Sequence, residues 1–216
     1  MDSNARLGLS ADEVLTTTRA VRRRLDFERP VARELLRDCV TVARQAPSGR
    51  NRQRWDFVFV GDGPRKREVA EWWLAGLRAG QPGGALTRDG SSAGWRRIAA
   101  SLDDLASRLH DAPWLMIPCV RVDSRAELDD VRGQAGAWGS VLPAVWSFML
   151  AARERGLGTA WTTAHLTFER EVAGVLGIPY DTVVQAALTP VAHTVGTDFA
   201  PARRAPTEDF VHWDEW

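Results

Sequence analysis

The sequence is poor in lysine, cysteine and tyrosine, and it carries no net charge. Lys66 is the only lysine among 28 basic residues, and 28 acidic residues balance them at neutral pH. A neutral chain has no overall field that would draw it to nucleic acid or to an anionic membrane surface, so we expect neither as a partner. Any anion that it binds must be recognised locally, for which planar arginine side chains are well suited.

The two cysteines do not have the spacing of a redox-active cysteine pair or of a metal site. Cys39 and Cys119 lie in apolar stretches far apart in the sequence, and they match neither a redox pair nor a metal-ligand spacing. We therefore expect two buried thiols and no metal site. The first 13 residues hold no apolar run preceded by positive charge, and no stretch approaches about 18 uninterrupted apolar residues. The sequence thus predicts a cytoplasmic protein without a membrane segment.

Segments with helical periodicity alternate with β-rich segments, and neither an internal repeat nor a linker between two cores is present. The 216 residues, 44% of them hydrophobic, are expected to form a single domain over residues 1–216. We predict an α+β fold with helices on both sides of a mixed, mainly antiparallel sheet. The expected helices cover residues 11–17, 35–46, 65–77, 95–109, 136–155 and 168–176. The expected strands cover residues 55–60, 113–120, 159–162 and 183–191.

Two segments lack a regular pattern. Residues 80–94 are rich in glycine, serine and proline, which indicates a variable insertion or a lid. The tail, residues 197–216, has too little periodicity to fold alone, yet it carries the aromatic residues Phe199, Phe210, Trp213 and Trp216. Because solvated tails seldom contain four large aromatic side chains, we expect the tail to wrap around a partner subunit.

Arginines gather at two places in the chain. Arg19, Arg22 and Arg23 follow the first predicted helix, and their guanidinium groups suit the oxygens of a phosphate dianion. The alternative is a solvated basic helix end that the helix dipole favours. Arg203 and Arg204 in the tail either add charge at the same phosphate or keep the tail soluble. Neither cluster decides between its two interpretations.

Two further segments carry groups that suit a heterocyclic ligand. Ser48, Asn51 and Gln53 bring hydroxyl and amide groups onto one short loop after Pro47, where they match a ligand with both donors and acceptors. They also fit a loop whose side chains satisfy its own backbone. Residues 156–163 contain two glycines that allow close backbone approach to a ring, or that form an ordinary helix cap.

A serine hydrolase is the main competing class of enzyme. Ser48 or Ser140 would need a histidine as a base, and the chain has four histidines. Neither serine lies in a G-x-S-x-G motif, and none of the histidines lies in a diagnostic motif, so chance scatter explains them better. The four histidines are His110, His165, His193 and His212.

Taken in order, these segments resemble the nitroreductase family of FMN-dependent oxidoreductases over nearly the whole chain. The matching motifs are R-x-V-R at residues 19–22, A-P-S-x-x-N-x-Q-x-W at 46–55, a long apolar helix at 139–153, G-L-G-T at 156–159, L-G-I-P at 176–179 and V-x-W at 211–213. Their order along the chain carries the resemblance more than any one motif does. It implies an α+β intertwined homodimer with FMN at the interface between the subunits.

The resemblance also implies roles for individual residues. The phosphate of FMN would be held by Arg19, Arg22 and Arg204, with Arg23 and Arg203 as further contacts. The ribityl chain and the ring would be contacted from the other subunit by Ser48, Asn51 and Gln53. The backbone near flavin N5 would be that of Trp161, Thr162 and Thr163.

The activity implied by the resemblance is the transfer of hydride from NADH or NADPH, through FMN, to an organic acceptor such as a nitroaromatic or a quinone. The cofactor itself carries this chemistry, so no catalytic side chain is assigned. The chain departs from the family pattern at Ala20, where serine or threonine is frequent, and at Ala202, where lysine is frequent. These departures leave one alternative, a flavin-binding protein without turnover.

Overall fold

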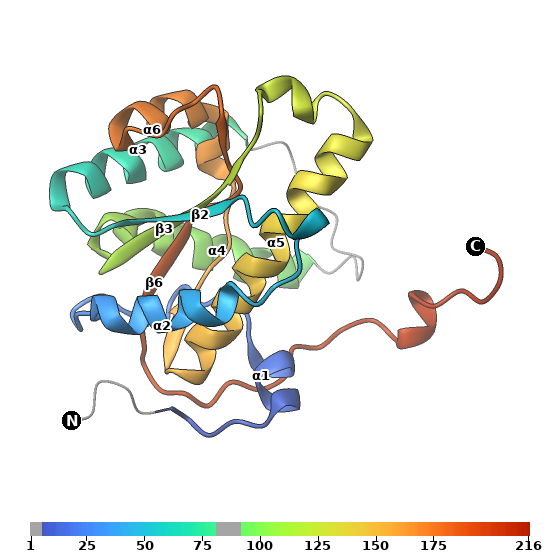
Figure 1. The fold of residues 1–216 in the computed structure, drawn as a ribbon. Helices are drawn as coiled ribbons and strands as arrows, with labels where there is room; N and C mark the ends of the chain where they lie inside the picture. The colour runs from blue at the N-terminus through green and yellow to red at the C-terminus, as the bar shows by residue number, and fades with distance from the viewer. Residues whose placement is uncertain (1–5, 81–91) are drawn as a thin grey trace.

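The computed structural model describes residues 6–80 and 92–216, in which helices surround one sheet (Figure 1). The α-helices are α1 (Ala11–Thr17), α2 (Arg33–Ala43), α3 (Gly63–Ala79), α4 (Ser92–Arg108), α5 (Val131–Glu154) and α6 (Glu169–Leu176). The strands are β1 (Leu25–Asp26), β2 (Trp55–Val60), β3 (Trp114–Arg121), β4 (Leu157–Thr159), β5 (Val183–Gln185) and β6 (Thr189–Thr194). Short 3-10 helices are η1 (Gly49–Asn51), η2 (Leu109–Asp111), η3 (Arg125–Leu128), η4 (Ala164–Phe168) and η5 (Thr207–Asp209).

The sheet is antiparallel, and its main path runs β1-β6-β3-β2, with β4 paired to β6 and β5 paired to β3. β2 lies beside β3 from Trp55 opposite Val120 to Val60 opposite Leu115. Within the described residues β3 is the only neighbour of β2, so β2 forms an edge of the sheet. The antiparallel pairing and the helices on both faces confirm the predicted α+β class.

β3 is the central strand, and its side chains enter two cores. Met116 and Val120 pack with α2 and α5, whereas Leu115 and Ile117 pack with α3 and α6. Successive side chains of a strand point to opposite faces, so a strand covered on both sides reads as one apolar run. Figure 1 accordingly places α3 and α6 on one side of β2 and β3, and α2 on the other.

α5 is the longest helix, and it begins at Val131 rather than at the predicted residue 136. The carboxylate of Asp130 caps it by accepting a hydrogen bond of 2.9 Å from the amide of Gly133. By length and composition alone α5 could cross a membrane, with a mean hydropathy of 1.3 over its most apolar window. Half of that window is buried inside the fold, where Val145 and Phe148 pack against α2 and β3. Its apolar composition is therefore accounted for by the core.

The prediction of one long strand over residues 183–191 is wrong, because the chain forms two strands, β5 and β6, with residues 186–188 between them. Gln185 lies opposite Cys119 and Thr189 lies opposite Met116, so three residues face two residues of β3. This extra residue is a β-bulge. Pro118 has no N–H to donate there, and Leu188 instead exchanges two backbone hydrogen bonds with Thr162.

Two other predicted boundaries also need correction. The strand expected over residues 159–162 begins earlier, at Leu157, because Gly156 with φ of 70° already turns the chain out of α5. Thr162 forms only an isolated bridge to Leu188. α2 ends at Ala43 and not at residue 46. In the following turn the Ala46 amide bonds to the carbonyl of Ala43, three residues back, in place of the four-residue spacing of an α-helix.

Both cysteines are buried free thiols, as the sequence predicted. Cys39 on α2 and Cys119 on β3 have no exposed surface. Burial raises the pKa of each thiol to about 12, so both stay protonated and unreactive at neutral pH.

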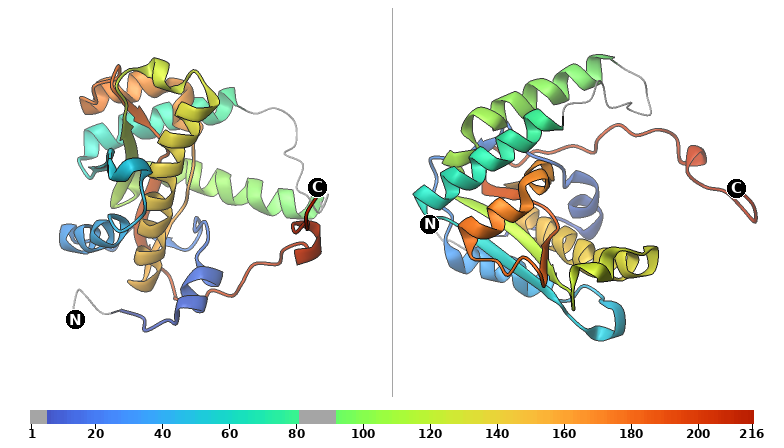
Figure 2. Two further views of the ribbon diagram at one scale, coloured as in Figure 1. Left: turned by 45° about the vertical axis from the view of Figure 1, so that its right-hand side comes forward. Right: turned by 90° about the horizontal axis from the view of Figure 1, so that it is seen from above.

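The tail stays against the body of the subunit as far as Ala200, where Arg24 and Arg19 contact it, and its later part runs out from the body in Figure 1 and in the right view of Figure 2. Phe199 is partly buried against the core, whereas the later aromatic side chains are exposed, with Phe210 54%, Trp213 82% and Trp216 100% accessible. The predicted insertion at residues 80–94 lies largely outside the described residues, which end at Gly80 and resume at Ser92.

Candidate functional site

The early arginines lie beside β4, although about 140 residues of sequence separate the two segments. The amide of Val21 donates a hydrogen bond of 2.8 Å to the carbonyl of Thr159, and Ala20 forms a parallel bridge with Thr159. Trp161 lies only two positions after Thr159. The fold therefore brings the R-x-V-R segment next to the segment that contains Trp161, Thr162 and Thr163.

A pocket of about 230 Å³ opens at the early arginines, with Ser101 of α4 and Phe199 of the tail completing its wall. Arg22 donates to the hydroxyl of Ser101 over 3.3 Å, and Arg23 donates to the carbonyl of Ala100 over 3.2 Å. Within the described residues neither guanidinium contacts a carboxylate. The pocket is thus a positively charged recess.

Burial lowers the pKa of Arg22, because its partly buried charge has lost water without gaining a carboxylate. Such a cation is stabilised by an anion that enters the pocket. The phosphate dianion of FMN fits this requirement, since it would supply the charge that the pocket lacks.

Arg24 and Arg19 are already tied to the first part of the tail. Arg24 forms a 2.5 Å ion pair with Asp198 and lies 4.2 Å from the centre of the Phe199 ring. Arg19 donates to the carbonyl of Ala200 over 3.3 Å. These contacts place residues 198–200 at the rim of the arginine pocket.

Arg203 and Arg204 follow that rim segment, and both are exposed. No contact to another described residue holds either side chain. Arg203 lies three residues beyond Ala200, so its Cα lies within about 11 Å of the Ala200 Cα. The structure brings the tail arginines near the pocket without joining them to it.

The segment from Trp161 to Thr163 is held by the sheet and by α3. The amide of Thr162 donates to the carbonyl of Leu188 over 3.0 Å, and its hydroxyl accepts from the indole N–H of Trp73 over 2.9 Å. The amide of Thr162 is therefore already engaged, whereas those of Trp161 and Thr163 donate to no backbone carbonyl among the described residues.

α3 packs tightly against the residues that follow this segment. A Cβ added at Gly76 would lie 1.9 Å from the carbonyl oxygen of Ala164, so only glycine fits there. The next residue, His165, is fully buried, and neither of its ring nitrogens has a hydrogen-bond partner among the residues that the structure describes. Burial lowers the pKa of His165 to about 4, so the ring is neutral at physiological pH.

The loop with Ser48, Asn51 and Gln53 lies away from the arginine pocket, and none of its residues lines that pocket. Gln53 donates its amide to the hydroxyl of Ser48 over 3.1 Å and its side chain to the oxygen of Asn51 over 2.8 Å. Arg50, Asn51 and Gln53 have φ values of 53°, 54° and 51°, which is the left-handed region. Asn51 and Gln53 are exposed, so this loop projects its amides to the outside of the subunit.

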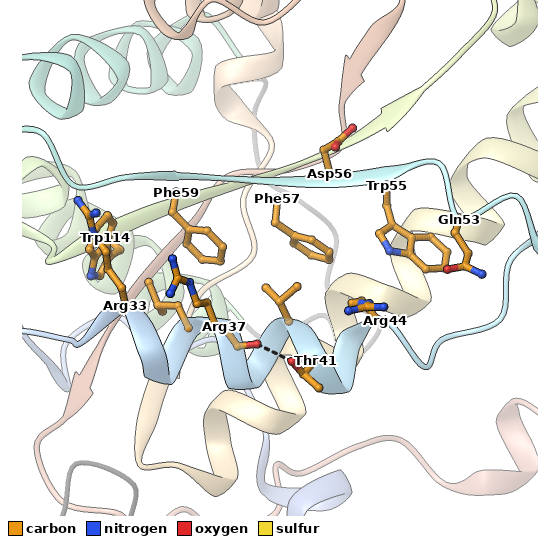
Figure 3. Close-up of a pocket in the computed structure, with 12 residues that line it drawn as sticks. Arg33, Arg37, Thr41, Arg44, Gln53, Trp55, Asp56, Phe57, Phe59 and Trp114 are labelled. Atoms are coloured by element: carbon orange, nitrogen blue, oxygen red, sulfur yellow. Dashed lines mark hydrogen bonds between the residues drawn. The ribbon is translucent and has the colours of Figure 1, made fainter.

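A groove of about 800 Å³ between α2 and β2 was not anticipated from the sequence (Figure 3). Trp55, Phe57 and Phe59 point from β2 toward α2, while Asp56 points away. The α2 side of the groove carries the side chains of Arg33, Leu36, Arg37, Val40, Thr41 and Arg44. Aromatic residues at every second position of the edge strand were the signal that could have predicted it.

The hydrolase alternative has no support in the geometry. Within the described residues no hydrogen bond joins Ser48 or Ser140 to a histidine. His165 is buried without a partner, and the described part of the chain contains no group of three or more His, Cys, Asp or Glu residues placed to hold a metal ion.

A family model described as the nitroreductase family matches residues 15–193. The chain belongs to the nitroreductase family. The match includes the arginine segment, the loop of residues 48–53 and the segment of residues 161–163, and it ends before the tail. Membership of this family makes the protein a flavin-dependent oxidoreductase.

Solved structures share this nitroreductase fold at low sequence identity. A BluB-like flavoprotein from Clostridium difficile 630 matches with a TM-score of 0.70 and 18% identity over 96% of this chain and 100% of that chain. The FMN and NADPH-dependent nitroreductase NfnB from a Sphigopyxis strain matches with a TM-score of 0.66 and 24% identity over 96% and 100%. Oxidized iodotyrosine deiodinase bound to FMN and 3-iodo-L-tyrosine matches with a TM-score of 0.68 and 23% identity over 94% and 98%.

Proposed function

We propose that this nitroreductase binds FMN and transfers hydride from NADH or NADPH to an organic acceptor such as a nitroaromatic or a quinone, in the cytoplasm. The observation that carries the proposal is the contact between Val21 and Thr159, which joins the arginine pocket to the segment ending at Thr163. This contact supports the proposal because it brings the arginines proposed for the phosphate close in space to the backbone amides of Trp161 and Thr163, which are proposed to face the ring.

In the proposal, Arg22 and Arg23 bind the phosphate, because they carry positive charge without a carboxylate partner among the described residues. Arg19 borders the pocket, and Arg203 and Arg204 add charge once the tail closes over the rim. Arg24 is excluded from this role, since Asp198 already neutralises it.

The amides of Trp161 and Thr163 face the ring in the proposal, and Thr162 fixes their position through Trp73 and Leu188. Bound FMN would supply the hydride-transfer chemistry. The protein's part is to hold the ring at this backbone and to shape the space where reductant and acceptor enter in turn.

The functional unit in the proposal is a homodimer. Ser48, Asn51 and Gln53 do not reach the arginine pocket of their own subunit, so their hydroxyl and amide groups are proposed to contact the flavin held by the partner. Leu142 and Trp146 on α5, four residues apart and therefore on one helix face, are 36% and 40% exposed. Apolar side chains on this face suit a subunit interface.

The tail is proposed to occupy the α2–β2 groove of the partner subunit. It pairs aromatic side chains with four acidic residues, Glu208, Asp209, Asp214 and Glu215. The groove pairs aromatic side chains with the arginines of α2, so the two surfaces match in both charge and polarity (Figure 3). Removal of residues 205–216 is expected to convert the dimer into monomers in sedimentation velocity, and an unchanged dimer would contradict this placement.

The visible spectrum of protein purified without added cofactor tests the proposed function. Flavin absorption bands that bleach when NADH or NADPH is added without oxygen, and that return when a quinone is added, are the expected result. A protein that is colourless and takes up no FMN on titration would contradict the proposal. Flavin bands that neither nicotinamide bleaches would favour the alternative, a flavin-binding protein without turnover.

A further inference from the structure

A cavity of about 470 Å³ lies beside the loop of residues 48–53, between the end of β3 and the first half of α5. This volume suits a small organic molecule. Five arginines line it, namely Arg50, Arg52, Arg54, Arg121 and Arg132. We refer to it as the α5 cavity, and the assignments above give it no role.

Two of these arginines are neutralised by carboxylates. Arg54 contacts Glu127 at 3.0 Å, and Arg121 makes a two-point contact with Asp56 at 2.7 and 2.8 Å. Bidentate pairing of this kind uses both the charge and the donors of the guanidinium group. Carboxylates of the protein therefore already satisfy Arg54 and Arg121, and these two arginines need no bound anion.

Asp130 also lines the cavity, where its carboxylate caps α5 through the Gly133 amide, and the other three arginines outnumber it, so the cavity keeps positive charge. Arg52 approaches its nearest carboxylate, that of Glu127, only to 3.9 Å. Within the described residues Arg50 and Arg132 have no acidic partner. Arg132 also lies in the first turn of α5, where the helix dipole disfavours a cation, so helix stability does not account for it.

The lining of the α5 cavity includes a hydroxyl group without a partner among the described residues. Ser140 is only 7% exposed, yet it lines the cavity, and its hydroxyl makes no hydrogen bond to another described residue. Gly136, one turn earlier, has no atom within 4 Å of the position of a Cβ. A small molecule in the cavity can therefore reach both a hydroxyl donor and the unpaired arginines.

We propose that the α5 cavity binds the electron acceptor and that this acceptor carries a carboxylate or phosphate group. Arg50, Arg52 and Arg132 would bind its oxyanion, and Ser140 would donate a hydrogen bond to its body. The inference rests on the proposed function, because the loop that forms one wall also carries Asn51 and Gln53, which are assigned to the flavin of the partner subunit. Among nitroaromatics and quinones, the cavity would favour those that carry a negative charge.

The test compares 4-nitrobenzoate with 4-nitrobenzamide, a neutral molecule of similar shape, using the FMN-loaded dimer and saturating NADPH. The wild-type protein is expected to have a kcat/KM about tenfold higher for the nitrobenzoate. Arg132→Gln and Arg50→Gln should each remove about tenfold of kcat/KM for nitrobenzoate and leave nitrobenzamide within about twofold. Arg78→Gln, at an exposed arginine of α3, is the matched control and should leave kcat/KM unchanged for both acceptors.

Calorimetric titration of the FMN-loaded protein with 4-nitrobenzoate supplies a second readout that needs no turnover. Binding should weaken in Arg132→Gln and with rising salt. Equal efficiency for both acceptors in a yellow, active protein would overturn the inference and leave the proposed function intact. A variant effect confined to the NADPH over NADH ratio would also overturn it, because the oxyanion would then be the phosphate of the reductant. A colourless, inactive protein would instead contradict the proposed function.

Discussion

The two halves of the candidate flavin site are held in different ways. Arg22 and the segment around Thr162 are tied into the subunit by β4, Leu188 and Trp73. The loop of Asn51 and Gln53 is held chiefly by its own hydrogen bonds and is exposed. Because the second half projects outward, we propose that a partner subunit completes the flavin site.

The largest effect is expected where the fixed half is packed most tightly. Gly76→Ala would place a methyl group against the Ala164 carbonyl, and overpacking of this kind should lower the free energy of unfolding by about 3 kcal/mol. Gly174→Ala in α6 is the matched control, because nothing lies within 4 Å of its Cβ position. Urea denaturation should show the control to be as stable as the wild type or more stable. Equal stability of both variants would mean that α3 does not fix the segment after Thr163.

Within the arginine segment, Arg22 and Arg24 are expected to differ sharply. Arg22→Ala removes an unpaired cation and should raise the dissociation constant of FMN about thirtyfold. Arg24→Ala removes a cation that Asp198 already neutralises, so its effect on FMN should stay below about threefold. Quenching of flavin fluorescence during titration measures both constants. Equal losses in the two variants would contradict the assignment of the phosphate to Arg22.

The buried ring of His165 should make the fixed half sensitive to acid. Its folded pKa of about 4 lies below the unfolded value of 6.5, so the unfolded chain binds the proton more readily between these pH values. Stability is therefore complete above pH 6.5, and about 2 kcal/mol of it is lost by pH 5.

His165→Phe should remove this loss, which urea denaturation at pH 7 and pH 5 will measure in both proteins. His193, whose pKa burial also lowers, is present in both and cancels in the comparison. If the variant loses as much stability between pH 7 and pH 5 as the wild type does, the acid sensitivity has another source.

The smallest effect on stability is expected in the exposed loop. Gln53→Gly relieves a left-handed backbone conformation and removes one exposed hydrogen bond, so the free energy of unfolding should change by less than about 0.5 kcal/mol. Retention of FMN by the dimer should nevertheless fall. A loss of stability similar to that of Gly76→Ala would show that the loop is fixed within its own subunit after all.

Much of the fold follows from local sequence patterns. The helix predicted over residues 11–17 begins at a capping box, in which Ser10 and Glu13 form both reciprocal hydrogen bonds, and β2 and β3 lie where alternating or continuous apolar residues predict strands. The prediction failed where a distant residue sets the geometry. The bulge after Gln185 depends on Pro118 and Thr162, which no pattern within residues 183–191 contains.

The candidate site shows the same difference between local sequence features and contacts of distant residues. The chemical groups of the site can be read from the chain alone: the arginines before β1, the amides of the loop after Pro47 and the acidic, aromatic tail. Their arrangement depends on the packed fold, which brings Val21 against Thr159, Asp198 onto Arg24 and the Leu188 carbonyl to the amide of Thr162. Periodicity and capping act over a few residues, whereas these contacts join segments far apart in the chain and depend on how the whole core packs.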